Sequence, residues 1–358
     1  MRWIDQDASA ILCPTDRRDA VTSLQSPALA AAPSPGWLGR HLPGLGLTFG
    51  IAALAMAAQR LSGIAGLSPL ALAMVLGIAW RNVIGLPAAA RAGIGFSLRR
   101  ILRLAIVLLG FQLTLAQLRT VGLPGVAVIA LTLAATFVFT TWTGRALGVA
   151  PRLTQLIAAG TSVCGASAVI ATNTVTRGSD EDVAYAIAIV TVFGSLSMLA
   201  MPGIGSLLAL DAAHYGIWVG ATVHEVAQVV GAGFQHGAEA GQAAAVAKLS
   251  RVILLAPLIL CLGALARRRG GAGGRAPTPW FVLGFVAVVL VNSIAPLPAA
   301  LQNAVVLVTG FLLTVALAAM GLETDIRKLR AQGMRPLALG ALAWVFISGL
   351  GLALVELI

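Results

Sequence analysis

Residues 153–176 read LTQLIAAGTSVCGASAVIATNTVT, an uncharged stretch long enough to cross a bilayer as a helix. A transmembrane helix needs about 20 mainly apolar residues. Near the centre, at residues 160–167, two glycines and three hydroxyl side chains weaken the helix, because glycine adds backbone entropy and hydroxyls offer competing hydrogen bonds. The sequence therefore predicts a membrane span that is non-helical or kinked near the midplane of the bilayer.

Apolar stretches of similar length recur through the rest of the chain. Hydrophobic residues make up 58% of the 358 residues and charged residues 10%, whereas about a quarter of a soluble domain is charged. We place eleven candidate spans, at residues 44–61, 67–84, 101–118, 123–147, 153–176, 183–208, 213–233, 242–266, 280–295, 300–322 and 336–357. The seventh carries His214, His224 and Glu225, so a re-entrant segment is the alternative to a full crossing there. The predicted fold class is therefore all-α, a polytopic membrane protein of about 10–11 transmembrane helices.

Residues 1–43 are polar and irregular, and residues 44–358 form the predicted multi-span domain. Within the polar tail, residues 28–30 (ALA) resemble a signal-peptidase site. However, the charged residues 16–19 (DRRD) stand where an apolar core should precede such a site. The tail is therefore predicted to be a cytoplasmic segment and not a cleaved signal.

The formal net charge of +11 would point to nucleic acid in a soluble chain. We reject nucleic acid as a partner, because the basic residues are spread over short loops between apolar runs, as in the cytoplasmic loops of membrane proteins. With the N-terminus inside, the inside loops hold most of the basic residues: Arg81, Arg91, Arg99, Arg100, Arg103, Arg145, Arg152, Arg267, Arg268, Arg269, Arg275, Arg327, Lys328, Arg330 and Arg335. The outside loops hold only Arg60, Arg119 and Arg177. This asymmetry predicts a cytoplasmic N-terminus and an outside C-terminus, although the inside loop around Asp211 has no basic residue.

Two internal similarities are visible. Residues 110–122 match residues 321–333 at a constant offset, and the two stretches end on opposite faces in the predicted topology, as an inverted repeat requires. Residues 160–164 (GTSVC) also match residues 220–224 (GATVH), but both members run the same way in that topology. The first similarity therefore predicts an inverted repeat, and the second does not fit the same symmetry.

The interrupted span is a candidate anion site. Lipid cannot satisfy backbone groups freed by a break, so such breaks face protein or a water-filled cavity. A second half-helix starting near Gly165 would present its N–H groups and positive dipole end at the midplane. The candidate substrate-binding residues are Gly160, Thr161, Ser162, Cys164, Gly165 and Ser167. The alternative is close helix–helix packing, which small residues also favour.

Ionisable residues in apolar stretches form the candidate coupling site. His224 and Gln228 are four residues apart, a spacing that places both on one face of a helix, and Glu225 follows His224 directly. Ionisable groups within a membrane usually face a pathway or a partner. Either Glu225 or His224 is a candidate carrier of a coupling proton. Lys248 and Arg251 begin a long apolar run, so they either extend to the interface or supply positive charge to an anion.

Six motifs in register resemble the YeiH-like family of proposed sulfate exporters in bacterial inner membranes. They lie at residues 109–114 (LGFQLT), 160–168 (GTSVCGASA), 183–188 (VAYAIA), 224–230 (HEVAQVV), 247–252 (AKLSRV) and 321–325 (GLETD). The resemblance covers about residues 44–358. It implies a multi-pass inner-membrane protein with an inverted-repeat secondary-transporter fold that exports sulfate or a related sulfonate-derived anion.

In such a fold two interrupted helices cross near the midplane. The resemblance places one of them at residues 160–167. The other would be the tenth span, interrupted at residues 309–310 or at Gly321.

The leading hypothesis is thus a secondary transporter for a small anion, embedded in a lipid bilayer and without a cofactor. A zinc site is disfavoured, because Gln228 stands where the second histidine of an H-E-x-x-H motif belongs. The enzyme alternative is an intramembrane serine hydrolase that uses Ser167 with His224 or His214, and a channel is a third alternative. A homo-oligomer remains open from the sequence.

The predicted topology can be checked at the C-terminus. The basic-loop asymmetry leads us to expect that a periplasmic reporter fused after Ile358 is active, because the last span ends outside. A fusion to a reporter that works only in the cytoplasm should be silent. Activity of the cytoplasmic reporter would contradict the predicted orientation.

Overall fold

The computed structural model describes residues 36–62, 68–115, 122–268, 280–327 and 333–358, and every regular element in those ranges is a helix. The all-α fold class is confirmed. The predicted tail at residues 1–43 lies mostly outside the described residues. The same is true of the ends of the first internal similarity, at residues 118–119 and 329–330, and of most of the basic loop at 267–275.

Six helices in the described ranges are long and apolar enough to cross a membrane. They are α1 (Trp37–Ser62), α6 (Gly122–Ala146), α9 (Asp180–Leu207), the pair α12 (Ala238–Ile253) and α13 (Leu255–Arg268), α15 (Ala299–Glu323) and α17 (Met334–Val355). Two apolar helices are shorter, α2 (Pro69–Val83) and α14 (Trp280–Ile294). A further continuous run consists of η1 (Ala88–Ala90), α3 (Arg91–Phe96), the π-helical η2 (Ser97–Ile101), α4 (Leu102–Leu109) and η3 (Gly110–Gln112).

The predicted interrupted span at residues 153–176 forms two helices, α7 (Pro151–Ser162) and α8 (Ala166–Thr176). They are separated by the non-helical residues 163–165. The predicted break is therefore confirmed. However, the two halves fold back on each other, since Thr176 Oγ1 at the end of α8 donates to Gln155 Oε1 in the first turn of α7 over 3.2 Å. The segment is a helical hairpin, named hairpin 1 here, and the prediction that it crosses the membrane is corrected.

A second hairpin, hairpin 2, consists of α10 (Ala212–Thr222) and α11 (Val226–Gly233), followed by the 3-10 turn η4 (Phe234–His236). The Tyr215 hydroxyl in α10 donates to the Ala232 carbonyl in α11 over 3.1 Å. The His236 ring stacks on the Tyr215 ring with centroids 4.1 Å apart. The predicted seventh span is thus also a hairpin, interrupted at residues 223–225.

The second interruption is not where the resemblance placed it. Helix α15 runs without a break from Ala299 to Glu323, through residues 309–310 and Gly321. Gly321 instead packs against α2 so closely that a Cβ on it would overlap the Met74 carbonyl. Glycine at that position therefore serves helix packing, which small residues permit in membranes.

The two hairpins enter the fold from opposite ends of α9. Hairpin 1 leads directly into Ser179, whose hydroxyl caps the start of α9. The 28 residues of α9 then carry the chain about 42 Å, at 1.5 Å per residue, to the loop where Asp211 caps α10. Since the bases lie at opposite ends of α9 and the tips meet, the tips lie near mid-membrane.

This arrangement removes the anomaly in the basic-loop pattern. Two crossings become hairpins, so the loop with Arg177 joins the basic side, and the loop around Asp211, which lacks basic residues, moves to the other side. Because the two changes cancel, the C-terminus keeps its predicted side. The hydrogen bond from the Tyr185 hydroxyl to the Gly333 carbonyl, 3.3 Å long, places the starts of α9 and α17 together.

The short similarity between residues 160–164 and 220–224 ends in the two hairpin tips. Hairpins that enter from opposite faces run in opposite directions, so the similarity is inverted. The interpretation that both members run the same way was wrong, because it treated each hairpin as a single crossing. The same offset relates α6 to α9 and α9 to α12.

The longer similarity is an inverted repeat in three dimensions. A Cβ on Gly110 at the end of α4 would lie 2.9 Å from the Phe285 carbonyl of α14. Gly321 at the end of α15 meets the Met74 carbonyl of α2 in the same way. The offset from Gly110 to Gly321 is the offset from Met74 to Phe285, so one contact maps onto the other.

A pair of hydrogen bonds obeys the same relation. The Leu115 backbone N–H donates to Ser293 Oγ over 2.7 Å, and the Ile326 N–H donates to Asn82 Oδ1 over 3.0 Å. The donors and the acceptors are each separated by the offset of the repeat. Helices α2 and α15 therefore form one half of a symmetric scaffold, and α14 and α4 form the other.

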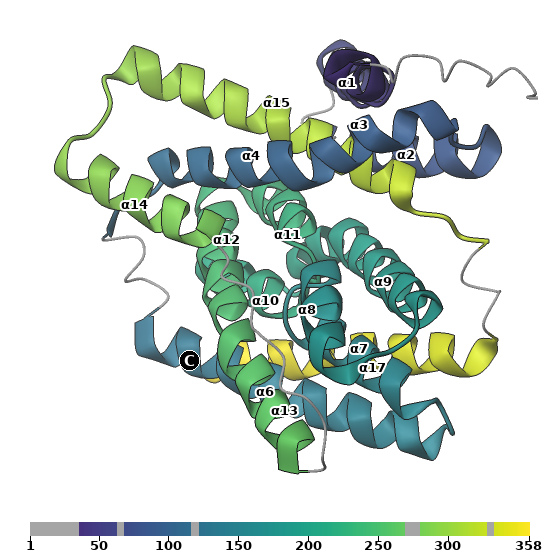
Figure 1. The fold of residues 1–358 in the computed structure, drawn as a ribbon. Helices are drawn as coiled ribbons and strands as arrows, with labels where there is room; N and C mark the ends of the chain where they lie inside the picture. Colours follow the sequence, from purple (N-terminus) through teal and green to yellow (C-terminus); the bar gives the residue numbers. More distant parts are fainter. Residues whose placement is uncertain (1–35, 63–67, 116–121, 269–279, 328–332) are drawn as a thin grey trace, which may run out of the picture. The chain divides into compact units, whose positions relative to one another are not determined.

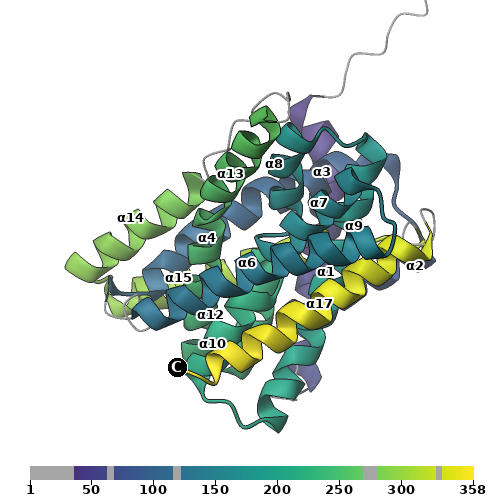
Figure 2. The same ribbon diagram turned by 90° about the horizontal axis from the view of Figure 1, so that it is seen from below.

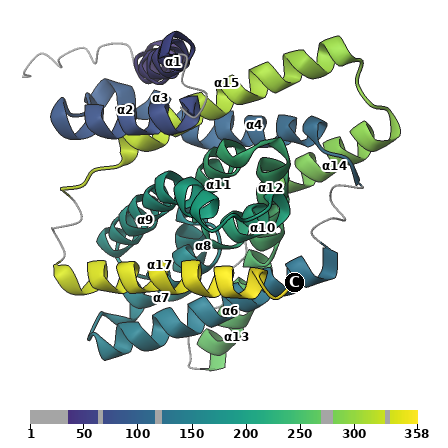
Figure 3. The ribbon, with the colours of Figure 1, turned by 180° about the vertical axis from the view of Figure 1, so that it is seen from behind.

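The helices from residue 37 onward lie on two sides of a central set (Figures 1 and 3). Helices α1 to α4 lie with α15 along one side, α6, α7 and α17 lie along the other, and α9 to α12 lie between. Helices α6 and α17 run side by side (Figure 2), and the Phe139 and Phe346 rings stack between them with centroids 4.0 Å apart. The hairpins pack against α6, α9, α12 and α17.

The hairpins can be tested by labelling single cysteines in a variant without Cys13, Cys164 and Cys261. We expect an impermeant maleimide added to intact cells to label Leu208→Cys and Ile358→Cys but not Asp180→Cys, because the start of α9 lies opposite the C-terminus. Two full crossings would instead place Asp180 and Ile358 on one side. Labelling of both would contradict the hairpins.

Candidate functional site

The two hairpin tips, residues 163–165 and 223–225, meet beside α12. Helix α12 contributes Lys248 and Arg251, both fully buried near the middle of the Ala238–Leu265 span. Close approach of α10 and α12 depends on Gly220, where a Cβ would lie 2.5 Å from the Ala247 side chain. The sequence left two fates open for the two cations, and the structure places both in the protein interior.

Both buried cations bond to backbone carbonyls at the ends of half-helices. Lys248 Nζ donates to the Val163 and Val223 carbonyls over 2.8 and 2.7 Å. Arg251 Nε donates to the Ser162 carbonyl over 2.6 Å, and its Nη2 donates to the Thr161 carbonyl. The last carbonyls of a helix lack intrahelical partners and carry partial negative charge. The two cations therefore satisfy the C-terminal ends of α7 and α10.

Glu225 serves the opposite helix ends. Its Oε1 accepts from the Ala166 N–H, the first of α8, over 2.6 Å. Its own backbone N–H, just before α11, donates to Gln228 Oε1 over 3.1 Å. A carboxylate is stabilised at a helix N-terminus by the free N–H groups and the dipole. Charged side chains thus match the polarity of three half-helix ends in this tip cluster, those of α7, α10 and α8, and the Gln228 amide serves the start of α11.

Gln228 ties hairpin 2 to α9. Its Nε2 donates to the Thr191 carbonyl over 3.0 Å and to Ser195 Oγ over 3.3 Å. The side chain fits because α9 has a glycine opposite it, Gly194, whose Cβ would overlap the Gln228 amide. Sequence reasoning missed Thr191 and Ser195, since isolated hydroxyls in an apolar helix carry no distinguishing pattern.

Gly165 is required for the contact between the tips. Its φ is +65°, in the left-handed region that side chains rarely adopt. A Cβ there would also overlap the Glu225 carboxylate. The other glycine of the motif, Gly160, lies within α7 and packs against Val169 and Val190, with a Cβ distance of 2.8 Å to each.

Three polar atoms in and beside the tips have no hydrogen-bond partner within the described residues. They are Thr161 Oγ1, Ser162 Oγ and His224 Nδ1, and each side chain is at most 1% exposed. The Cys164 thiol is buried beside them. Buried polar groups without partners are uncommon and costly, so these atoms are available to a bound molecule.

The tip cluster reaches the protein surface on one side. Glu225 and Ala166 are partly exposed, and the neighbouring Ser167 is exposed. Ser167 therefore lies at the accessible edge of the cluster and not among its buried hydroxyls. The N-terminus of α8, predicted to suit an anion, is occupied in the structure by the Glu225 carboxylate.

The serine hydrolase alternative requires Ser167 within hydrogen-bond reach of a histidine. In the described part of the chain, His214 bonds to Asp211, and His236 bonds to the Leu210 carbonyl. His224 Nδ1 is among the unpartnered atoms. No hydrogen bond joins Ser167 to a histidine within those residues. The described residues also contain no cluster of His, Cys, Asp and Glu side chains suited to a metal ion.

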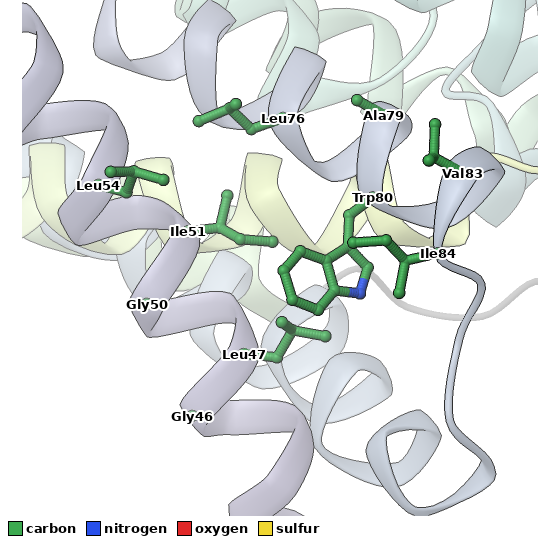
Figure 4. A pocket seen from close by; sticks show the side chains of 10 residues that line it. All are labelled: Gly46, Leu47, Gly50, Ile51, Leu54, Leu76, Ala79, Trp80, Val83 and Ile84. Atoms are coloured by element: carbon green, nitrogen blue, oxygen red, sulfur yellow. The ribbon is translucent and has the colours of Figure 1, made fainter.

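Two open hollows lie away from the tip cluster. One, of about 500 Å³, lies between α1 and α2 and is apolar except for the Trp80 indole (Figure 4). The other, of about 520 Å³, is lined by residues of α6 and α17. Neither of these two hollows is lined by residues of the hairpin tips.

Comparison with known proteins places these features in a family. The family model described as "Conserved hypothetical protein 698" matches residues 43–340. A UPF0324 membrane protein of Pseudomonas aeruginosa is 42% identical over 86% of this chain and 92% of its own length. The UPF0324 inner membrane protein YeiH of Escherichia coli is 36% identical over 87% of this chain and 93% of its own length. No solved structure matches.

Loss of a buried cation should destabilise the tips. We expect Lys248→Met to lower the thermal midpoint of the detergent-purified protein by several degrees, because it leaves the Val163 and Val223 carbonyls unpaired. Each unpaired buried group costs about 1–3 kcal/mol. Arg152→Met, at an exposed position of α7, is the matched control. Equal midpoints for the two variants would count against the capping role.

Proposed function

The chain belongs to the UPF0324 family of bacterial membrane proteins, and on that premise we propose that it is a secondary transporter for a small anion. The proposed location is the bacterial inner membrane, which is where the name of the Escherichia coli relative places that protein. The N-terminus is proposed to lie in the cytoplasm. The names of the relatives specify no substrate. The proposal therefore depends on the geometry of the tips and on their charge.

One observation supports transport above all: the two hairpins approach the tip cluster from opposite ends of α9. Each hairpin stands between the cluster and one membrane face. Opening one hairpin while the other stays closed exposes the cluster to one side at a time, which is the requirement for alternating access. A channel would need a continuous polar path, and the tips interrupt any such path at mid-membrane.

The sign of the substrate's charge follows from the charged side chains of the tip cluster. The cluster contains two cations, Lys248 and Arg251, and one carboxylate, Glu225. Buried charge without a counterion is costly, so a cluster with one excess positive charge favours an anion. The unpartnered atoms of Thr161, Ser162 and His224 supply additional hydrogen bonds to an oxyanion.

The residues assigned to substrate binding remain those of the interrupted stretch and its neighbours: Gly160, Thr161, Ser162, Cys164, Gly165 and Ser167. Gly160 and Gly165 act by allowing close packing, and the hydroxyls act as donors. The coupling and pathway residues are His224, Glu225, Gln228, Lys248 and Arg251. Sulfate or a sulfonate-derived anion is the proposed substrate, and export is the proposed direction, from the resemblance of the motifs.

Uptake into proteoliposomes tests the proposed function. We expect wild-type protein to move labelled sulfate, sulfite or a sulfonate across the bilayer, with a rate that depends on a pH gradient. Arg251→Gln should reduce uptake at least tenfold, because it removes one positive charge from the cluster, and Arg152→Gln should have no effect. Absence of uptake of every anion by folded wild-type protein would rule the proposal out.

A further inference from the structure

The place that would attract an anion most strongly already holds one. The Glu225 carboxylate accepts from the Ala166 N–H at the positive end of α8. Helix N-termini bind carboxylates, sulfates and phosphates through the same N–H groups. A substrate oxyanion and the Glu225 carboxylate therefore compete for one position.

Glu225 is also the one charged group of the tip cluster that is not fully buried. Glu225 is partly exposed, whereas Lys248 and Arg251 are fully buried. Lys248 faces it from α12, Cys164 faces it from hairpin 1, and His224 precedes it in the chain. Arg251 lies nearby, since its Nη1 donates to the carbonyl of Val223, two residues before Glu225. Protonation of the Glu225 carboxylate breaks none of the hydrogen bonds by which Lys248 and Arg251 cap the backbone carbonyls.

We propose that Glu225 is an internal anion that the substrate displaces, and that the substrate is a divalent oxyanion that binds together with one proton on Glu225. This inference rests on the proposed transport function and names its substrate class and coupling ion. The proton from solution forms an O–H bond on the Glu225 carboxyl group, whose oxygen leaves the Ala166 N–H. That N–H then donates to an oxygen of the substrate.

The charge of the cluster selects this combination. With Glu225 ionised, Lys248 and Arg251 leave one positive charge, and a dianion would give the buried cluster a net negative charge. With Glu225 protonated, the two positive charges balance a dianion fully. A dianion and a carboxylate at neighbouring donors would repel each other strongly in a medium of low dielectric constant. Binding of the dianion and protonation of Glu225 are therefore linked.

The surrounding residues allow the exchange. Gly165 has no side chain to hold the carboxylate in place or to obstruct an incoming anion. Three more polar groups lie in and beside the tips without a hydrogen-bond partner among the described residues: the hydroxyls of Thr161 and Ser162 and the Nδ1 of His224. The Glu225 carboxylate forms no hydrogen bond with any of them. An oxyanion with three or four oxygens makes use of more donors than one carboxylate does, which favours displacement.

Proton uptake on binding is the direct test. Wild-type protein in detergent and weak buffer is titrated separately with sulfate, thiosulfate and hydrogen phosphate, and the pH change is recorded beside the heat of binding. We expect about one proton taken up for each dianion bound. We also expect affinity to fall about tenfold per pH unit above the titration of Glu225, because a one-proton linkage has that slope.

Glu225→Gln removes the linkage while keeping an oxygen that can accept from the Ala166 N–H. We expect this variant to bind the dianion with no proton uptake and with affinity independent of pH. Glu239→Gln, an exposed acid in the first turn of α12, should behave as wild type. The wild-type proton measurement decides the question by itself if Glu225→Gln does not fold.

The outcomes separate this inference from the transport function. Binding of a dianion to wild-type protein without proton uptake overturns the role of Glu225 and leaves transport intact. Failure of all three dianions to bind, with transport of a monovalent anion into proteoliposomes, overturns the substrate class alone. Failure of every anion in the proteoliposome experiment overturns both proposals.

Discussion

The fold depends on the capping of half-helix ends by charged side chains at the centre of the membrane. A helix that stops inside a bilayer leaves carbonyl and N–H groups that lipid cannot satisfy. Lys248 and Arg251 satisfy the carbonyl ends of α7 and α10, and Glu225 satisfies the N–H end of α8. Removing these side chains leaves each tip with unpaired groups that favour a continuous helix or an exposed loop. The interruption of both hairpins and the presence of three charges in one apolar region therefore have a single physical cause.

The small residues around the tips follow from this capping. Gly165 leaves room for the Glu225 carboxylate, Gly194 leaves room for the Gln228 amide, and Gly220 brings α10 against α12. Without a hydrophobic force between helices in lipid, close backbone contact and hydrogen bonds must supply the association. Close packing at glycine also holds the scaffold together, where Gly110 and Gly321 occupy equivalent places in the inverted repeat.

Two symmetries thus meet in one chain. The scaffold formed by α2, α4, α14 and α15 repeats with one offset, and the hairpins with α6, α9 and α12 repeat with another. The tip cluster breaks the second symmetry, since Glu225 in one tip corresponds to Gly165 in the other. One tip supplies the carboxylate and the other receives it. An asymmetric charge at the meeting point of symmetric elements gives the two hairpins different roles in binding and release.

From the sequence alone follow the all-α, membrane-embedded fold, the helix interruption at residues 160–167, and the choice of residues 224, 225, 228, 248 and 251 as candidate coupling residues. Those conclusions follow from the cost of placing glycine, hydroxyls and charge in an apolar stretch, which is local. Whether an interrupted segment crosses the membrane or turns back was decided only by the tertiary structure, because both arrangements bury the same apolar residues. The second interruption was misplaced for the same reason. Helix α15 contains glycines but is unbroken, and Gly321 in it serves close packing on α2. Residues 223–225 have Lys248 and Arg251 to satisfy an open backbone. The occupation of the α8 N-terminus by Glu225 joins residues far apart in the chain, and no local pattern in the sequence encodes that distance.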